Sequence, residues 1–340
     1  MLLVMILRPK PSPRHHGALA GAPSIAPMAT VPAWLRRAIP DAQSRAGKDI
    51  EDVALVAGAA IGALDAVVRR QERWAGAWRQ RLALSAAAAT AKHAGRVEDE
   101  AALRDAVLLT RPGDNVGPAG LFLLAWRRLA SRPADDLLTE KNVAAVLEDL
   151  GLTLNDEAVS DLTDDLRQLA ANTGTVETLV GAFAAAERYR VLGAWLADVL
   201  LAQRLGWTHA IPLLGAEATL VVGTGRARRP VTAALAAGAE TGADRAKSLL
   251  AAQARAALRA IDLSAELGRR ADRLLAVAPK LRAKAADAVV NRLLSDDALV
   301  ASEKIAGMSD RGLRRLFDRL VELGAVRELS GRPTFRIYGI

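Results

Sequence analysis

The stretch that decides the fold lies near the C-terminus, where residues 309–324 read SDRGLRRLFDRLVELG. Ser309 is a favourable helix N-cap, and the apolar residues after it recur at intervals of three and four, which predicts a helix over residues 310–323. The apolar face of this helix comprises Leu313, Leu316, Phe317, Leu320 and Leu323. Gly324 is expected to end it, because glycine adopts the left-handed conformation of a helix C-terminus at little cost.

The residues after Gly324 change to the two-residue alternation of β-strands. We predict a short strand over residues 325–329, a turn at 330–333 and a second strand over 334–338. In the second strand, one side is expected to carry Phe335 and Ile337, and the other side Thr334, Arg336 and Tyr338. The sequence therefore predicts that the helix leads into a two-stranded hairpin.

Two further helices are expected ahead of this unit. An amphipathic helix is predicted over residues 281–294, and a short one, capped by Ser302, over residues 303–306. Gly307 and Met308 then form a tight turn. The order helix, short helix, turn, helix and hairpin is that of a winged helix-turn-helix. We therefore predict such a domain, with a two-stranded wing, over residues 280–340.

The chemistry of this domain follows from its geometry, since a helix that buries one face can lay the other in the major groove of DNA. The predicted DNA contacts are arginines of the helix, namely Arg311, Arg314, Arg315 and Arg319, together with Arg332 at the hairpin tip and Arg336 on its outer face. These side chains would meet phosphates or guanine edges. Asp318 and Glu322 share the helix face and would oppose a phosphate, so two alternatives stay open. In the first alternative, the arginines only keep an exposed helix face solvated. In the second, the domain contacts a protein partner.

The distribution of charge favours a polyanionic partner. The 340-residue chain has 46 Lys plus Arg against 38 Asp plus Glu, a formal net charge of +8. Residues 241–340 carry a net charge of +7, whereas residues 151–200 carry −5. A basic C-terminal region suits nucleic acid. Only 8 of the basic residues are Lys, however, and a GC-rich coding sequence would also produce an arginine-rich chain.

Residues 31–279 are predicted to form a separate, all-helical domain. Capping residues, terminal glycines and apolar residues at helical spacing delimit one helix after another. The expected helices are 49–70, 74–94, 97–109, 118–130, 139–150, 155–171, 175–205 and 241–278, the last with a possible break at 262–264. Residues 219–222 show the one strand signature of this part. Tryptophans spread among the helices are interpreted as core anchors, with a ligand pocket lined by some of them as an alternative.

The first 30 residues are predicted to be a disordered tail, because prolines recur through them. The apolar run over residues 1–6 is shorter than a secretory signal, and its basic residues follow the run instead of preceding it. Met28 is an alternative start of the protein. No later stretch reaches the roughly 18 consecutive apolar residues of a membrane-spanning helix. We therefore expect a cytoplasmic protein with no membrane partner.

The composition argues against several kinds of chemistry. The chain has no Cys, which excludes disulfides, thiolate metal sites and a cysteine nucleophile. Its four His form no evident cluster. A carboxylate-rich helix face, made of Glu157, Asp161, Asp164 and Asp165, is interpreted as solvated and not as a metal site. Residues 223–225 lack the third glycine and the following helix of a dinucleotide site. We expect no metal, no cofactor and no enzymatic activity.

Several motifs resemble those of a known family. They are residues 74–84 (WAGAWRQRLAL), 111–114 (RPGD), 281–284 (LRAK), 309–320 (SDRGLRRLFDRL) and 331–339 (GRPTFRIYG). Together they resemble a bacterial family catalogued as domain of unknown function fourteen-oh-three, over roughly residues 30–340. The ending is also similar to helix-turn-helix modules joined to other N-terminal domains. The resemblance implies a portable C-terminal module and brings no catalytic residues with it.

The sequence therefore predicts a non-enzymatic protein of two domains. An all-helical domain that senses, assembles or docks is followed by a winged helix that binds duplex DNA in a regulatory role. The alternative is an interaction or assembly protein whose winged helix contacts a protein partner. The oligomeric state stays open.

Overall fold

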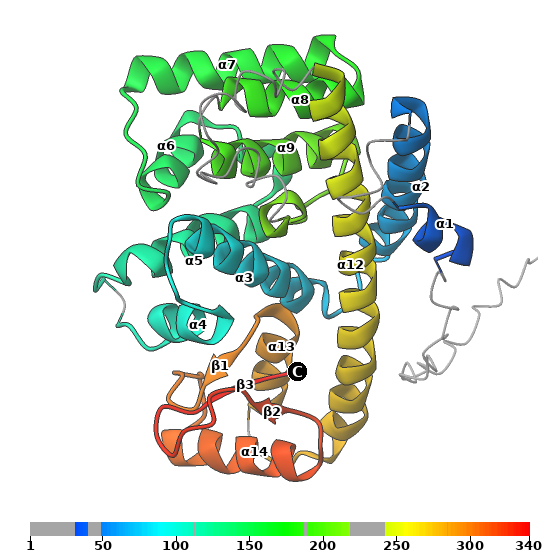
Figure 1. The fold of residues 1–340 in the computed structure, drawn as a ribbon. Coiled ribbons are helices and arrows are strands. Elements are labelled where there is room, and N and C mark those ends of the chain that lie inside the picture. Colours follow the sequence, from blue (N-terminus) through cyan, green and yellow to red (C-terminus); the bar gives the residue numbers. More distant parts are fainter. Residues whose placement is uncertain (1–30, 40–48, 112, 187–188, 218–241, 284) are drawn as a thin grey trace, which may run out of the picture. The chain divides into compact units, whose positions relative to one another are not determined.

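The computed structural model describes residues 31–39, 49–111, 113–186, 189–217, 242–283 and 285–340 (Figure 1). Val31–Ile340 form one compact unit. The predicted tail over residues 1–30, the predicted strand over residues 219–222 and the glycine-containing segment after it lie outside the described residues. The division into domains at residue 280 stays a prediction.

The described residues are mainly helical, as predicted. The α-helices are α1 (Ala33–Ala38), α2 (Ile50–Arg69), α3 (Ala75–His93), α4 (Glu100–Leu108), α5 (Gly117–Ser131), α6 (Glu140–Asp149), α7 (Asp156–Asn172), α8 (Thr175–Ala185), α9 (Arg190–Arg204), α12 (Gly242–Val277), α13 (Ala286–Ser295) and α14 (Asp310–Glu322). Short 3-10 helices are η2 (Ala134–Asp136), η3 (Leu214–Ala216) and η4 (Ala278–Lys280). Among the described residues, no helix combines the length and the apolar composition needed to cross a bilayer.

Helix α12 connects the parts of this unit. Its 36 residues correspond to about 54 Å of helix, and it packs against α2, α3, α8 and α13 (Figure 1). The expected break at residues 262–264 does not occur. Asp262 instead forms a bidentate ion pair with Arg36 of α1, at 2.9 and 2.5 Å, and Ser264 is buried within the helix. Asp262 and Ser264 are weak helix formers, but the stretch contains neither of the strong helix breakers, Gly and Pro. Tertiary contacts are therefore enough to keep it helical.

The single helix predicted over residues 175–205 is wrong, because the chain forms two helices there, α8 and α9. Tyr189, whose φ of −94° and ψ of 72° are not helical, is the N-cap of α9. The two helices pack against each other, and Gly193 of α9 allows the contact, since a Cβ there would lie 2.8 Å from the ring of Phe183. A continuous helix would hold these two residues far apart, so this pairing favours the break.

The predicted role of tryptophan as a core anchor is confirmed for several residues. Trp126 and Trp195 are fully buried, and their indole nitrogens donate to Thr90 Oγ1 at 2.9 Å and to the Ala125 carbonyl at 3.2 Å. Because both indole N–H groups have a hydrogen-bond acceptor, these large side chains are buried without the cost of an unpaired donor. Trp34 is the exception, because half of its side chain is exposed.

The C-terminal residues 286–340, called the C-terminal module from here on, contain a small antiparallel sheet. Its strands β1 (Leu299–Val300), β2 (Arg327–Glu328) and β3 (Ile337–Gly339) lie in the order β1-β3-β2. Tyr338 at the centre pairs with Leu299 on one side and with Glu328 on the other. The hairpin after α14 is therefore present, with shorter strands than predicted, and β1 is an additional strand that the sequence reading missed.

Of two other helices predicted in this region, one begins later than expected and one is absent. The helix predicted from residue 281 begins only at Ala286, because Ala285 has a left-handed φ of 63°. The short helix predicted over residues 303–306 is absent: residues 303–305 form no regular secondary structure, and turns lie on either side, at 301–302 and 306–307. Pairing of β1 with β3 continues to Ala301, whose N–H donates to the Arg336 carbonyl at 2.9 Å. The chain then turns at residues 301–302, where the Glu303 N–H donates to the Val300 carbonyl at 3.1 Å, so Ser302 belongs to this turn and does not cap a helix.

Candidate nucleic-acid interface

Helix α14 forms as the sequence predicts. Ser309 accepts a hydrogen bond from the Gly312 N–H at 3.2 Å, which caps the helix, and Gly324 follows its last turn with a φ of +65°. The buried face consists of Leu313, Leu316, Phe317 and Leu320. Because this face is fixed on the core, the direction of the opposite face is fixed too.

The opposite face of α14 is exposed and rich in arginine. Arg311, Arg314 and Arg315 are all exposed, and the described residues provide none of them with an ion-pair partner. Arg319 differs, because it pairs with Glu322 one turn later at 2.7 Å. Three of the four helix arginines predicted to contact DNA are therefore free to bind an external anion.

A groove of about 430 Å³ separates α14 from the hairpin. Its lining includes Arg314 and Asp318 from the helix and Phe335 and Arg336 from the hairpin. Arg336 lies 3.9 Å from Asp318 and 3.8 Å from Glu328, so it faces α14 and is held between two carboxylates. Two of the six arginines predicted to contact DNA, Arg314 and Arg336, thus line one groove, together with the carboxylate of Asp318, which opposes anions.

Phe335 is the unexpected residue of this groove. It was predicted to point to the same side as Ile337, but it is 70% exposed, whereas Ile337 is buried. Its φ of 53° is left-handed, which costs a residue other than Gly about 1–2 kcal/mol. β3 begins only at Ile337, so Phe335 does not follow the alternation of the strand. An exposed aromatic ring in a strained conformation is a feature that marks binding sites.

Tyr338 was also predicted on the outer side of the hairpin, and this is wrong. Its ring stacks on that of Phe317 in α14, with centroids 4.3 Å apart and an angle of 6° between the planes. On the other face of the sheet, Ile337 packs with Val300 and with Leu108 and Leu109 at the end of α4. Both faces of the sheet are therefore covered, which the period-two pattern alone could not show.

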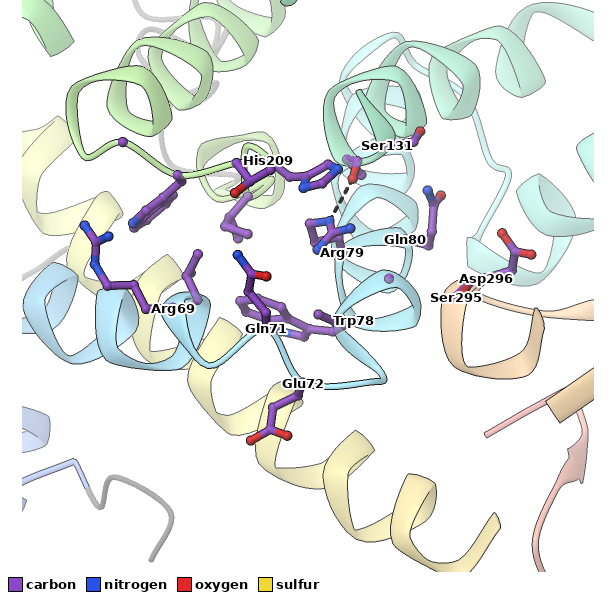
Figure 2. A pocket seen from close by; sticks show the side chains of 18 residues that line it. Arg69, Gln71, Glu72, Trp78, Arg79, Gln80, Ser131, His209, Ser295 and Asp296 are labelled. Carbon is purple, nitrogen blue, oxygen red and sulfur yellow. Dashed lines mark hydrogen bonds between the residues drawn. The ribbon is translucent and has the colours of Figure 1, made fainter. Parts of the chain in front are cut away.

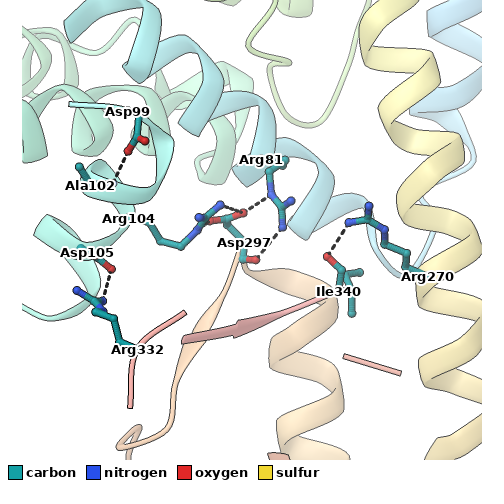
Figure 3. Close-up of polar contacts among 9 residues, drawn as sticks. All are labelled: Arg81, Asp99, Ala102, Arg104, Asp105, Arg270, Asp297, Arg332 and Ile340. Carbon is teal, nitrogen blue, oxygen red and sulfur yellow. Dashed lines mark hydrogen bonds and ion pairs between the residues drawn. The ribbon is translucent and has the colours of Figure 1, made fainter. Parts of the chain in front are cut away.

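The hairpin tip does not project freely into solvent. Arg332 donates to Asp105 of α4 at 2.7 Å, so this predicted DNA contact already has an intramolecular partner (Figure 3). The pair is partly exposed, with 39% and 30% of the two side chains accessible. Arg332 thus differs from the arginines of α14 that have no ion-pair partner among the described residues, because it already has a carboxylate partner.

A buried carboxylate joins the C-terminal module to the helices before it. Asp297, directly before β1, accepts hydrogen bonds from Arg81 of α3 and from Arg104 of α4, the latter at 2.6 Å (Figure 3). Burial alone would raise the pKa of Asp297, but these arginines, with Arg127 farther away, hold it below its ordinary value. Asp297 is therefore ionised at neutral pH and clamps the module in place.

The family comparison covers the parts just described. The family model described as "Protein of unknown function (DUF1403)" matches residues 23–340. The chain belongs to this family. Because the match continues to the last residue, α14 and its hairpin are included in the DUF1403 region. No curated protein matches the chain.

In this DUF1403 protein, the structure brings together some of the predicted site residues. Arg311, Arg314 and Arg315 share the exposed face of α14, and Arg336 lies across the groove from it. Arg319 and Arg332 are engaged with carboxylates. The sequence reading missed Phe335 as an exposed group, and its position after Pro333 was the available signal against a regular strand.

Proposed function

We propose that the C-terminal module is a winged helix that binds duplex DNA through the exposed face of α14, in a regulatory role. The observation that carries this proposal is the set of three exposed arginines, Arg311, Arg314 and Arg315, none of which forms an ion pair with a carboxylate among the described residues. The sheet order β1-β3-β2 and the position of α14 before the hairpin are typical of winged helices. Guanidinium groups suit both phosphates and guanine edges.

The groove beside α14 supports the same function. Arg314 would approach a phosphate, and the exposed ring of Phe335 offers a surface for sugar or base. Arg336 would contribute less than Arg314, because it already lies between Asp318 and Glu328. Asp318 opposes a phosphate at this point, so its carboxylate is expected to weaken binding and to favour base edges that donate hydrogen bonds. Arg332 is expected to contribute little, because Asp105 already neutralises it.

The test is DNA binding by the full chain over a series of salt concentrations. Each phosphate contact that is lost lowers the slope of log K against log salt by about one unit, so Arg314→Ala with Arg315→Ala is expected to lower it by about two. The matched control is Arg37→Ala with Arg132→Ala. These residues are also exposed arginines, on α1 and after α5, so the change in net charge is identical.

Two results would contradict this proposal. Wild-type protein that fails to bind random duplex DNA at low salt would exclude DNA binding. Equal losses of affinity in the α14 double variant and in the control would show that net charge, and not the α14 face, determines binding. Thermal unfolding of each variant confirms that folding is retained, which is expected because none of the four side chains is buried.

A protein partner is the second candidate, and Phe335 is the observation that favours it. An exposed aromatic side chain flanked by arginine and aspartate is typical of the centre of a protein interface. Under this alternative, Phe335→Ala abolishes complex formation, whereas under the DNA proposal it lowers affinity less than loss of Arg314 and Arg315 does. DNA binding by the wild type that Arg314→Ala with Arg315→Ala weakens more than Phe335→Ala does supports the DNA proposal, whereas no DNA binding by the wild type favours the protein partner.

A further inference from the structure

A second site lies away from the C-terminal module's groove, in a cavity of about 620 Å³ (Figure 2). Its walls come from the end of α2, the start of α3, the end of α5 and the segment 206–211. This volume is within the range of pockets that hold small organic molecules. The cavity is too large to be filled by a single inorganic ion. A specific ligand therefore needs an organic part that fills the remaining volume, in addition to any charged group.

Arg79 supplies the charge. Its Nε donates to the Ala130 carbonyl at 2.8 Å, which directs the rest of the guanidinium into the cavity. Within the described part of the chain, no carboxylate pairs with it, and burial lowers the pKa of Arg79. A half-buried guanidinium without an anion is costly, and an external anion would offset this cost.

The imidazole of His209 lies beside Arg79 in Figure 2, and both side chains line the cavity. Its backbone is fixed because residues 208–209 pair with residues 133–134, with the Ala134 N–H donating to the Thr208 carbonyl at 2.9 Å. Burial, and then the charge of Arg79, lower the pKa of His209. The imidazole is therefore neutral at pH 7 and has one N–H to donate to an anion.

Two amide side chains line the cavity beside Arg79. Gln71 follows the end of α2, where its left-handed φ of 45° is the usual conformation after a helix C-terminus, and its amide points toward Arg79 (Figure 2). On the other side of Arg79, Gln80 lines the same cavity and its Oε1 is buried without a hydrogen-bond partner.

The other charged residues of the wall do not neutralise Arg79. Arg69 pairs with Asp65 at 2.8 Å, and Asp296 pairs with Arg292 at 2.9 Å. Glu72 points away from Arg79 in Figure 2. The centre of the cavity, between Arg79 and His209, therefore keeps its positive charge.

The apolar part of the wall includes Val68 and Ala75, which are partly exposed, and the edges of two tryptophans. Trp78 and Trp207 are only 3% and 4% exposed, and their indole N–H groups already donate to the Ala260 carbonyl at 2.9 Å and to Asp65 at 2.8 Å. The tryptophans therefore add apolar edges to this wall and no free donor. Such a wall fits an aromatic or alicyclic body.

We propose that this cavity binds a small organic carboxylate with an apolar body, held by Arg79 and His209. A planar carboxylate matches the fork of one guanidinium. A phosphate would be expected to use more cations or a nest of backbone N–H groups, and the described wall places one unneutralised cation at its centre. This proposal does not depend on DNA binding by the C-terminal module.

The test uses the full chain and calorimetric titration with 3-phenylpropanoate and indole-3-propanoate as probes. At least one is expected to bind, whereas acetate, inorganic phosphate and the uncharged 3-phenylpropanamide are expected to bind at least tenfold more weakly. Phenyl phosphate distinguishes the two anion classes. Equal or tighter binding of phenyl phosphate, or no binding of either carboxylate at millimolar concentration, would overturn the proposal.

Variants then locate the site. Arg79→Gln is expected to weaken the carboxylate at least tenfold, and the control Arg69→Gln, at the rim of the same cavity, less than threefold. Ala75→Phe fills the cavity without a change of charge and is expected to abolish binding even where Arg79→Gln lowers thermal stability. Unchanged affinity in both Arg79→Gln and Ala75→Phe would place the ligand elsewhere and would exclude this cavity.

Discussion

Two aspartates in different parts of the molecule are equally buried, and their surroundings are opposite. Asp198 in α9 and Asp297 before β1 are each 1% exposed. Asp297 is surrounded by guanidinium groups, which lower its pKa against the effect of burial. Among the described residues, the partners of Asp198 are the N–H groups of Leu213 and Leu214, and burial raises its pKa well above the ordinary value. Burial alone therefore does not determine the charge of a carboxylate; its partners do.

The consequence is a difference in role. Asp297 is an ionised carboxylate paired with two guanidinium groups, and it joins α3 and α4 to the C-terminal module. Asp198 acts as a hydrogen-bond acceptor that fixes the start of η3, and a neutral acceptor would serve as well. The comparison thus separates a charge that the fold requires from one that the fold only tolerates.

The largest effect is expected from Asp297→Asn. This change leaves Arg81 and Arg104 buried without an anion, and it is expected to lower the free energy of unfolding by about 3–5 kcal/mol. Equilibrium unfolding in urea measures the change. A loss below about 1 kcal/mol would show that water replaces the carboxylate and that the clamp is not needed.

A smaller effect is expected at Asp198, and here the two substitutions differ. Asp198→Ala leaves two backbone N–H groups without an acceptor and is expected to cost about 2 kcal/mol or more. Asp198→Asn keeps an oxygen for both donors, and its cost is expected to stay below about 1 kcal/mol. If the Asn and Ala variants are equally unstable, the charge of Asp198 matters and the contrast with Asp297 is wrong.

The dependence on pH sharpens the same contrast. Because the folded pKa of Asp198 is raised, the wild type is expected to lose stability relative to Asp198→Asn as pH rises above about 4, by about 1.4 kcal/mol for each unit between the unfolded and folded pKa. Asp297 has the opposite sign, since its stabilisation is lost as pH falls below about 4 toward its lowered folded pKa. Urea unfolding of wild type and Asp198→Asn between about pH 4 and 8 tests the first expectation. A constant difference would contradict it.

The smallest effect is expected from Arg332→Ala. Its pair with Asp105 also joins the C-terminal module to α4, but both side chains are partly exposed. A double-mutant cycle with Asp105→Ala is expected to give a coupling of about 0.2–1 kcal/mol. A coupling energy as large as the free energy lost in Asp297→Asn would show that the partly exposed pair Arg332–Asp105 stabilises the module as much as the buried carboxylate does.

Local sequence determined much of the secondary structure. The helical class, the cap at Ser309, the apolar face of α14 and the left-handed Gly324 all follow from residues within a few positions of one another. The exposure of the arginines on α14 follows too, because one buried face fixes the opposite one. Errors arose where distant contacts decided the conformation, as at the break between α8 and α9 and at the start of α13.

Only the tertiary structure decided which polar residues have partners. Asp297 meets Arg104 across 193 positions of sequence, and Arg332 meets Asp105 across 227. The cavity around Arg79 and His209 likewise assembles segments that no periodic pattern connects. Helical spacing reports which side of an element is buried, but the identity of a buried charge's partner depends on how elements far apart in the chain pack together. For this reason the sequence by itself predicted α14, and the fold alone revealed the clamp at Asp297 and the cavity beside Arg79.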